Sequence, residues 1–593
     1  MFSYVLNLYK NHEYDKVLQY SGSTEEKILE LQGLAALKIN KDIDAFEIFK
    51  KLMVLNNLKI NIYHAALALM KLKEYKKAIK YFDECKSEIK LSITSRVNMS
   101  HCLLELKEIE QATQLLYQII KENPKIKPAW YMLLNTYRKL NQIEELKKIC
   151  SLANNYVGDS IEYHKSIVTI LFNKKEFNKI IKLYLETIYF KDELIKSYVA
   201  KSYLKLSQFN KSVKIYTLIL NENKSYINFF NLAAAYSNLT AEKDLMYAIK
   251  YSLKCLQTNK NYHQAHHCMA LSWKKLTILE KALICINKAI LIDRNNQDYL
   301  YIKATIYKEL GNKNESLKTL KIILNQNPNY NKALRLKGIV KLQLNKLKSS
   351  EKNLVKAIEI DNTDQRAIAY YAIAKMAQNK QDEVNEFLAL GHFVKEFKFD
   401  RIEGYDNLEE FNRAFEKDIK NHSLLRKEPN GLAARNGYLT DNIFADNAKS
   451  INSFKNTLLK KIYQYIDELP NNLKHHMLRH KTKEFKISSW ATWVHGDGFI
   501  DKHIHEDSWI SGAYYCKVPK ITDSTKQNEG YFEYGCIPND IDIIIEKKRG
   551  YIKPVEGKLV IFPSYLYHQT IPHITDEDRI SIAFDLTPKS WQK

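Results

Sequence analysis

Residues 503–515 read HIHEDSWISGAYY, and this stretch predicts an extended strand with a polar beginning. Three groups that can bind a metal, His503, His505 and Asp507, alternate along it, so on an extended chain their side chains share one face. The continuation, Trp509–Val518, is rich in aromatic and β-branched residues, which is typical of a β-strand. The stretch therefore predicts a sheet in which one strand carries potential metal ligands at its start.

More groups of this kind follow along the chain. His568 comes after Phe562-Pro563-Ser564, and Arg579 stands eleven residues beyond His568. Two histidines and one carboxylate with open positions are the usual ligand set of non-haem Fe(II). Paired ligands on one strand, a distant histidine and a later arginine therefore suggest such an iron with a bound keto acid. Any one of these histidines alone would more often be a structural residue, so the hypothesis depends on the whole set.

Bulk properties exclude several classes of protein. The 593 residues exceed what one domain core supports, and the formal net charge of +23 comes mostly from lysines spread through the helical part. Such a distribution favours a solvated surface over nucleic-acid binding. The eight cysteines form no CxxC pair, which predicts buried free thiols in a reducing compartment instead of a zinc site or disulfides. With no signal peptide and no apolar run long enough to span a membrane, a cytoplasmic location is expected.

A 34-residue period runs through residues 1 to about 390. It is seen by following one small or apolar position, and the steps of 32 and 36 residues on either side of Ser212 together restore the register. The phased residues are Ala45, Ala78, Ala112, Leu146, Ile180, Ser212, Ala248, Ala282, Ser316, Ser350 and Val384, with Val17 as a weaker start. Helix-stop signals recur at repeat ends, as at Asn123-Pro124 and Asn327-Pro328.

This pattern resembles the tetratricopeptide repeat, a helix–turn–helix unit, over about ten to twelve copies. The resemblance implies an α-solenoid whose hairpins stack into a superhelix with a groove, which in this family usually binds peptides or proteins. Tyr63, Tyr131, Tyr198 and Tyr301 are candidates to line the groove, although aromatic residues of helices more often pack against their neighbours.

The composition changes after about residue 390, where eleven of the 16 glycines and eight of the 11 prolines are found. Amphipathic helices are predicted at Tyr405–Lys420 and Asn452–Leu469, with a loop over Gly431–Asn442 between them. Short strands then follow quickly, at Phe485–Val494, Lys502–His505, Trp509–Val518, Gly530–Tyr534, Tyr551–Pro554, Lys558–Phe562, Tyr567–Pro572 and Arg579–Leu586.

Short strands behind two flanking helices suit a double-stranded β-helix, which is a jelly-roll barrel. The predicted fold class is therefore a multidomain α plus β chain, with an N-terminal α-solenoid and a C-terminal barrel. We expect three parts: the repeat superhelix at 1–390, a linker with helices of the catalytic region at 391–484, and the barrel core at 485–593.

The last 190 or so residues resemble the Fe(II)- and 2-oxoglutarate-dependent oxygenases. They are most similar to the bacterial group of putative 2OG-Fe(II) oxygenases, which often carries tetratricopeptide repeats. The resemblance is carried by His503-Ile504-His505 with Ser511-Gly512-Ala513-Tyr514-Tyr515, by Gly557–Ser564 (GKLVIFPS), by His568 with Arg579–Asp585 (RISIAFD), and by Tyr405–Asn412 (YDNLEEFN).

This resemblance implies a role for each site residue. His503, His505 and His568 are expected to be the iron ligands at the catalytic centre. Arg579 is expected to grip the distal carboxylate of 2-oxoglutarate at two points, as a guanidinium does. Ser581 and Tyr515 are expected to add hydroxyl groups to this cosubstrate-binding set.

Other polar residues near the motif leave one question open. The wider superfamily has His-x-Asp or His-x-Glu, and His505-Glu506-Asp507 satisfies that spacing, so Asp507 can replace His503 or His505 as a ligand. His495-Gly496-Asp497 repeats the spacing within a turn, and His573 is expected to be a loop residue. The remaining histidines of the region are expected to be exposed: His475, His476 and His480.

The resemblance implies an oxidoreductase, a hydroxylase that uses Fe(II), 2-oxoglutarate and O2. The repeats imply that its substrate is a protein or peptide. No membrane partner is expected, because the sequence has no apolar run long enough to span a membrane. Two alternatives are weighed against it. One is a non-catalytic repeat scaffold with a cupin-like barrel, and the other is an oxidative demethylase of nucleic acid, which the charge of +23 motivates.

Overall fold

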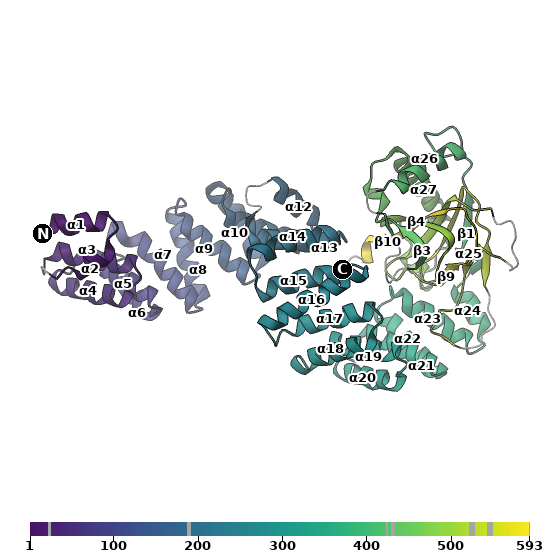
Figure 1. Ribbon diagram of the computed structural model, residues 1–593, viewed down its shortest axis with the longest axis horizontal. Coiled ribbons are helices and arrows are strands. Elements are labelled where there is room, and N and C mark those ends of the chain that lie inside the picture. The colour runs from purple at the N-terminus through teal and green to yellow at the C-terminus, as the bar shows by residue number, and fades with distance from the viewer. Residues whose placement is uncertain are drawn as a thin grey trace. The chain divides into compact units, whose positions relative to one another are not determined.

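The computed structural model describes residues 1–21, 25–186, 191–388, 390–422, 425–427, 433–520, 528–542 and 549–591. The chain forms two compact units, Met1–Ile219 and Leu220–Lys593 (Figure 1). Over the described ranges, none of the helices combines the length and the apolar character that crossing a membrane requires. All eight cysteines are buried free thiols.

Helical hairpins build the first unit. The helices that begin in it are α1 (Phe2–Lys10), α2 (Tyr14–Gln19), α3 (Glu26–Lys38), α4 (Asp42–Leu55), α5 (Lys59–Lys71), α6 (Tyr75–Glu84), α7 (Ile89–Glu105), α8 (Ile109–Glu122), α9 (Lys127–Lys139), α10 (Ile143–Val157), α11 (Ile161–Asn173), α12 (Phe177–Glu186), α13 (Glu193–Lys205) and α14 (Phe209–Glu222).

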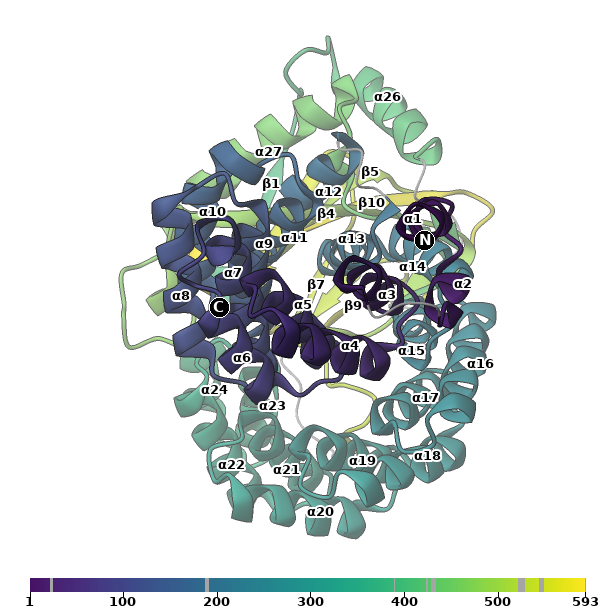
Figure 2. The ribbon, with the colours of Figure 1, turned by 90° about the vertical axis from the view of Figure 1, so that its left-hand side faces the viewer.

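The hairpins continue in the second unit, and Figure 2 shows α16 to α22 following one another along an arc. These helices are α15 (Tyr226–Ser237), α16 (Glu242–Thr258), α17 (His263–Lys275), α18 (Leu279–Ile292), α19 (Gln297–Glu309), α20 (Lys313–Gln326), α21 (Asn331–Gln343), α22 (Leu347–Ile360), α23 (Gln365–Met376), α24 (Gln381–Leu388) and α25 (Leu390–Phe393).

The phased residues of the repeat lie where the two helices of a hairpin pack against each other. All of those followed in the sequence, from Val17 and Ala45 to Val384, are at most 3% exposed. Ser316 Oγ donates a hydrogen bond to Ala304 O at 2.8 Å, and Ser350 Oγ makes the same bond to Gly338 O at 2.7 Å. Where the helices approach this closely, a larger side chain would push the two backbones apart, which explains why alanine or serine is the usual residue at this position.

Tight turns within the hairpins recur at the same period. A residue with a left-handed backbone follows the C-cap of the first helix in most hairpins, and in the part of the chain that the structure describes only one of these residues is a glycine. They include Lys73, Lys107, Asn141, Lys175, Ser207, Thr277, Gly311, Asn345 and Asn379, all with φ between 54° and 78°. The turn requires this conformation whatever the side chain, so the fold accepts a local backbone cost in most repeats.

A seven-stranded antiparallel sheet and a three-stranded sheet form the C-terminal part of the second unit. The large sheet has the order β1-β8-β5-β10-β4-β3-β2, and the small one β7-β6-β9. The strands are β1 (Lys395–Lys398), β2 (Arg426–Lys427), β3 (Ala434–Leu439), β4 (Phe485–Ile500), β5 (Ile510–Lys517), β6 (Phe532–Tyr534), β7 (Gly550–Ile552), β8 (Lys558–Pro563), β9 (His568–Thr570) and β10 (Arg579–Pro588).

Seven of the predicted strands are present, and three sequence predictions in this region are wrong. His495-Gly496-Asp497 was expected in a turn, but it lies within β4, which extends to Ile500. Lys502–His505 forms only an isolated bridge, in which His503 pairs with His568. Gly431–Asn442 was expected to be a loop, but its described part contains β3, which pairs with β4. A register shift beside Asn436, whose φ is 48°, makes a bulge in β3, and this explains why its Asn-Gly sequence resembles a turn.

Helices α26 (Leu408–Lys420) and α27 (Lys449–Glu468) flank the large sheet, as predicted, and short 3₁₀ turns occur at Ile443–Ala445, Leu478–His480 and Lys589–Trp591. One apolar core includes residues of the last repeats, such as Ile373 of α23, and residues of the barrel, such as Trp509 and Tyr565. The predicted boundaries at 390 and 484 lie inside this second unit, and the division into three domains stays a prediction.

Candidate metal centre

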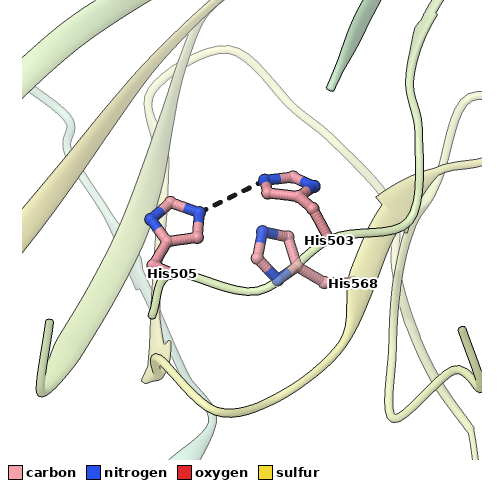
Figure 3. A group of neighbouring side chains, drawn as sticks. All are labelled: His503, His505 and His568. Carbon is pink, nitrogen blue, oxygen red and sulfur yellow. Dashed lines mark hydrogen bonds between the residues drawn. The ribbon is translucent and has the colours of Figure 1, made fainter. Parts of the chain in front are cut away.

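Three histidines meet at one end of the barrel (Figure 3). His503 and His505 come from the segment after β4, and His568 begins β9. Potential ligand atoms of the three rings lie within 4.8 Å of one another, so the group can hold a metal ion. Two backbone hydrogen bonds of 3.1 Å join His503 to His568, which holds both chain segments in place. The structure thus brings together the predicted histidine set, and the ligand roles themselves stay a prediction.

In both His503 and His568, Nδ1 (the outer nitrogen, which faces away from the other rings) has a hydrogen-bond partner. His503 Nδ1 lies 2.8 Å from Asp501 O, and His568 Nδ1 lies 2.9 Å from Leu566 O. A carbonyl oxygen can only accept, so each Nδ1 carries the proton and each Nε2 keeps a lone pair. This tautomer is the one that a histidine needs in order to bind a metal through Nε2.

His505 completes the arrangement with a different partner. Its Nδ1 lies 2.6 Å from Asp585 Oδ1, and its Nε2 lies 3.2 Å from His503 Nε2 (Figure 3). If both Nε2 atoms carry lone pairs, no hydrogen bond can form between them. A cation at this point would satisfy both atoms, so the donor set fits a divalent metal.

Burial keeps the imidazoles of His503 and His568 neutral. It lowers the pKa of His503 to about 4, with a smaller contribution from His505. Burial, followed by repulsion from the other two histidines, also lowers the pKa of His568 well below its usual range. Two of the rings are therefore uncharged near pH 7, which is the state that binds metal.

The carboxylate of Asp585 is partly buried beside the histidines and stays ionised. Desolvation alone would raise its pKa, but the electrostatic attraction of His505 and the hydrogen bonds from His505 and Ser511 outweigh it and lower the pKa. Ser511 Oγ donates to Asp585 Oδ1 at 2.6 Å and also lies 2.7 Å from Ser564 Oγ. A serine pair therefore holds the carboxylate on the side of His505 away from Nε2.

A cavity of about 500 Å³ extends from the histidines between the two sheets. Strand β10 lines it with Arg579, Ser581, Ala583 and Asp585, while the residues between them face the core and are buried. Because side chains of a strand alternate, one run of sequence supplies both the wall of the cavity and the apolar layer behind it.

Arg579 lies in this cavity with an uncompensated charge. Its side chain is 4% exposed, and it donates one hydrogen bond of 2.6 Å to Gly530 O. Its guanidinium carbon lies 5.4 Å from the centre of the Tyr515 ring. Among the described residues no carboxylate pairs with it, and burial lowers its pKa. A buried cation without an anion is unfavourable, so this position fits an anionic ligand.

Hydroxyl groups surround the same point. Ser581 stands opposite Tyr515 of β5 and Thr492 of β4, and all three line the cavity. The buried Tyr515 hydroxyl has no partner within hydrogen-bond geometry among the described residues; burial raises its pKa to about 12, and the neighbouring Arg579 opposes that rise. A buried hydroxyl beside a guanidinium that no described carboxylate neutralises fits a carboxylate that both can bind.

The structure also places the residues that competed for these roles. Asp507 is exposed and lies outside the histidine group, because the chain turns at Glu506 and Asp507 and ends the alternation. His495 is an exposed residue that pairs with Asp578 at 2.9 Å. His573 lies in a loop, as expected, although it is buried.

Three histidines predicted to be exposed are not, and that prediction is wrong. His476 is buried and stacks on Phe387 of α24, with ring centres 3.8 Å apart. His475 Nε2 lies 3.1 Å from Phe387 O, and His480 Nε2 lies 3.2 Å from Asn362 O. Because they stand among lysines and arginines in the sequence, exposure was predicted, but the last repeats pack over them.

Two site residues were missed as functional candidates. Asp585 shares the face of Arg579 and Ser581 on β10, so the alternation itself could have identified it. For Trp490 the sequence favours a residue that fills the barrel or its mouth over one that stacks on a substrate, but its ring stacks on His505 with centres 5.5 Å apart, and it lines the cavity. No motif in the sequence marks that contact.

Comparison with known families agrees with the two sequence resemblances. Residues 488–585 match the family of the putative 2OG-Fe(II) oxygenases, and residues 61–88 match the tetratricopeptide repeat. The first match contains every residue that the histidine group and the Arg579 pocket require. The predicted fold class, a repeat solenoid joined to an antiparallel barrel, is confirmed.

Similar proteins cover only parts of the chain. The DnaJ homolog subfamily C member 7 homolog of Dictyostelium discoideum is 23% identical over 214 residues, which are 34% of this chain and 39% of that protein. The chain therefore matches about two fifths of this relative's length. Among solved structures, YrrB, a TPR protein with an unusual peptide-binding site, is 19% identical, covers 29% of this chain and 87% of its own, and has a TM-score of 0.25. The Cut9–Hcn1 hetero-tetramer of the APC/C is 14% identical, covers 64% of this chain and 84% of its own, and has a TM-score of 0.33.

Proposed function

From a chain that joins tetratricopeptide repeats to a putative 2OG-Fe(II) oxygenase domain, we propose an Fe(II)- and 2-oxoglutarate-dependent dioxygenase that hydroxylates a protein or peptide side chain. One observation carries the proposal furthest. A buried arginine that pairs with no carboxylate in the described part of the chain shares a cavity with three histidines whose Nε2 atoms can bind a metal. The cavity therefore fits a divalent metal and an anion together.

In this proposal the site residues have two separate roles, metal binding and cosubstrate binding. His503, His505 and His568 would hold Fe(II), and Arg579 with Tyr515 and Ser581 would hold the distal carboxylate of 2-oxoglutarate. When bound, the iron and the keto acid supply the oxidation chemistry, in which O2 is consumed, the keto acid becomes succinate and CO2, and a C–H bond is hydroxylated.

The remaining task of the protein is orientation and exclusion of water. The two-point grip of Arg579 would fix the direction of the keto acid in the cavity. Phe532 and Phe562 pack against His568, with ring centres 5.5 and 4.6 Å away. These aromatic walls make the metal end of the cavity apolar, which strengthens the electrostatic contacts made there.

The repeats support a protein or peptide as the substrate. Arg366 of α23 pairs with Glu506 at 2.7 Å, and Glu506 lines the cavity beside His505. A repeat helix thus reaches the rim of the proposed site. Tetratricopeptide repeats commonly bind other proteins, so a substrate held by them would be presented near the cavity. A cytoplasmic location stays part of the proposal.

The test is turnover by the purified full-length chain with Fe(II), 2-oxoglutarate and O2. Succinate formation is expected, including a slow rate without substrate. The absence of any 2-oxoglutarate consumption in a protein that binds Fe(II) would contradict the proposal, and failure to bind Fe(II) would favour the non-catalytic scaffold. Substrate candidates can be captured with Arg579→Ala as a trap and identified by mass spectrometry.

A further inference from the structure

The outer nitrogens of the three site histidines are not treated alike. His503 and His568 face neutral backbone carbonyls at 2.8 and 2.9 Å, whereas His505 faces the Asp585 carboxylate at 2.6 Å. A shorter distance is expected where one partner is ionised, because charge-assisted hydrogen bonds are shorter and stronger. Only one imidazole of the group is therefore in contact with a negative charge.

The fold holds this carboxylate firmly in place. Asp585 lies on β10, the strand between β4 and β5, where it faces Ser488 on one side and Ser511 on the other. Its side chain is 15% exposed and accepts the hydrogen bond of Ser511. A residue in the middle of a sheet with a supported side chain can orient a neighbour more accurately than a loop residue can.

The usual ligand set of this kind of iron contains one carboxylate, which lowers the positive charge of the metal. A histidine binds metal as the neutral imidazole, so a set of three histidines provides no such charge. A carboxylate bonded to the outer nitrogen of a histidine raises the basicity of the ligand and fixes its ring. We propose that Asp585 is a positioning residue that orients His505 and supplies, through it, the negative charge that the three histidines lack. The inference rests on the proposed function, because it concerns the same metal.

The experiment compares the full-length chain with Asp585→Asn. Asparagine has nearly the same shape and can still accept a hydrogen bond, so the change removes mainly the charge. We expect the affinity for Fe(II), and for Co(II) as a redox-stable probe, to fall about 10- to 100-fold, the range for losing an outer partner of a metal-bound histidine. The Fe(III)/Fe(II) potential should rise, because the ferric ion needs the negative charge more.

Asp578→Asn is the matched control. Asp578 also pairs with the Nδ1 of a histidine, His495 at 2.9 Å, and its side chain is 17% exposed. It precedes β10 and lies outside the histidine group, so the same substitution should leave the metal affinity unchanged. Ser511→Ala is a second variant, because it keeps the Asp585 charge but loosens its position, and we expect a smaller loss of affinity.

Each outcome decides the inference. Equal metal affinity and equal potential in wild type and Asp585→Asn would overturn it while leaving the proposed function intact. An equal loss in Asp585→Asn and Asp578→Asn would also overturn it, because the effect would then be general. A wild-type chain that binds no metal would remove both proposals. If circular dichroism shows Asp585→Asn to be unfolded, Ser511→Ala decides, and a wild-type affinity in that variant counts against the inference.

Discussion

At the scale of single residues, the partner of Nδ1 distinguishes a histidine that can bind metal from one that fills a core. His503 and His568 have a backbone carbonyl at Nδ1 and turn Nε2 toward a shared point. His476 is as buried as His568, but it stacks on Phe387 and its Nε2 has no partner among the described residues. Burial is common to both kinds, so only the direction of the free nitrogen separates them.

His568→Ala should abolish metal binding without unfolding the chain. It removes one of the three proposed ligands from the start of a short strand, and the loss should exceed the roughly 100-fold upper range for an outer-shell partner. Titration with Co(II), with circular dichroism as the check on folding, measures it. His495→Ala is the control, because that residue is exposed and lies outside the group. A near-native affinity in His568→Ala would show that the metal site is misassigned.

Arg579→Ala should weaken 2-oxoglutarate by about 2–3 kcal/mol, the range for losing a charged hydrogen-bond partner, while Fe(II) binding survives. Arg579→Lys should recover only part, because an ammonium group cannot make the two-point contact. Anaerobic titration of the Fe(II)-loaded chain with 2-oxoglutarate measures both. Arg413→Ala, at an exposed arginine of α26, is the control. Unchanged affinity in Arg579→Ala would remove the cosubstrate assignment.

Sequence could place part of this site and not the rest. The alternation on β10 puts Arg579 and Ser581 on one face, and it needs no knowledge of the other strands. The role of Asp507 could not be decided, because the turn at Glu506 that removes it from the histidine face is a local backbone detail. The bond between Asp585 and Ser511 depends on the register of two strands that lie 74 residues apart.

At the scale of elements, hydrophobic patterning predicted most strands, because each of them has one face in a core. It missed β1, a strand of four residues with charged side chains that lies at the edge of the large sheet. It also missed β3, whose bulge replaces the alternation. Edge strands and bulges are set by pairing with a neighbour, and a local pattern does not carry that information.

The left-handed turns of the repeats provide a test at this scale. Thr277 is exposed, β-branched and has a φ of 60°, whereas Gly311 has a φ of 78° at the equivalent turn of the next repeat. Thr277→Gly should stabilise the second unit by about 1 kcal/mol, because relief of the backbone cost outweighs the added freedom of glycine in the unfolded chain. Urea unfolding measures the change.

Gly311→Ala should have the opposite effect and lower the stability of the second unit by about 1 kcal/mol. A Cβ at this glycine would meet nothing within 4 Å, so the expected loss comes from the backbone conformation alone. If both substitutions shift stability in the same direction, the turns are not governed by their φ angle.

At the scale of the second unit, a single carboxylate binds the barrel to three repeat helices. Asp540 accepts hydrogen bonds from Lys308 of α19 at 2.7 Å, from Gln343 of α21 at 3.1 Å and from Tyr370 of α23 at 2.8 Å. These partners lie 170 to 232 residues away in the sequence, which is why no local pattern could predict the docking.

Asp540→Ala should lower the stability of the second unit by about 1–3 kcal/mol, because it leaves donors of three helices without their acceptor. A double-mutant cycle with Lys308→Ala should give a coupling near 1 kcal/mol, since the pair is partly exposed. Asp542→Ala, at an exposed aspartate two residues further on, is the control. A cycle without coupling would show that the contact does not hold the barrel to the repeats.

The apolar core that contains both Ile373 and Trp509 has a practical consequence for recombinant production of the oxygenase part. A gene fragment that starts near residue 390 would encode a barrel whose buried Tyr565 and Tyr567 faced water, and such a product should collect in inclusion bodies. A fragment that starts at Ser225, the N-cap of α15, would keep the repeats of the second unit and should give soluble material for crystallisation.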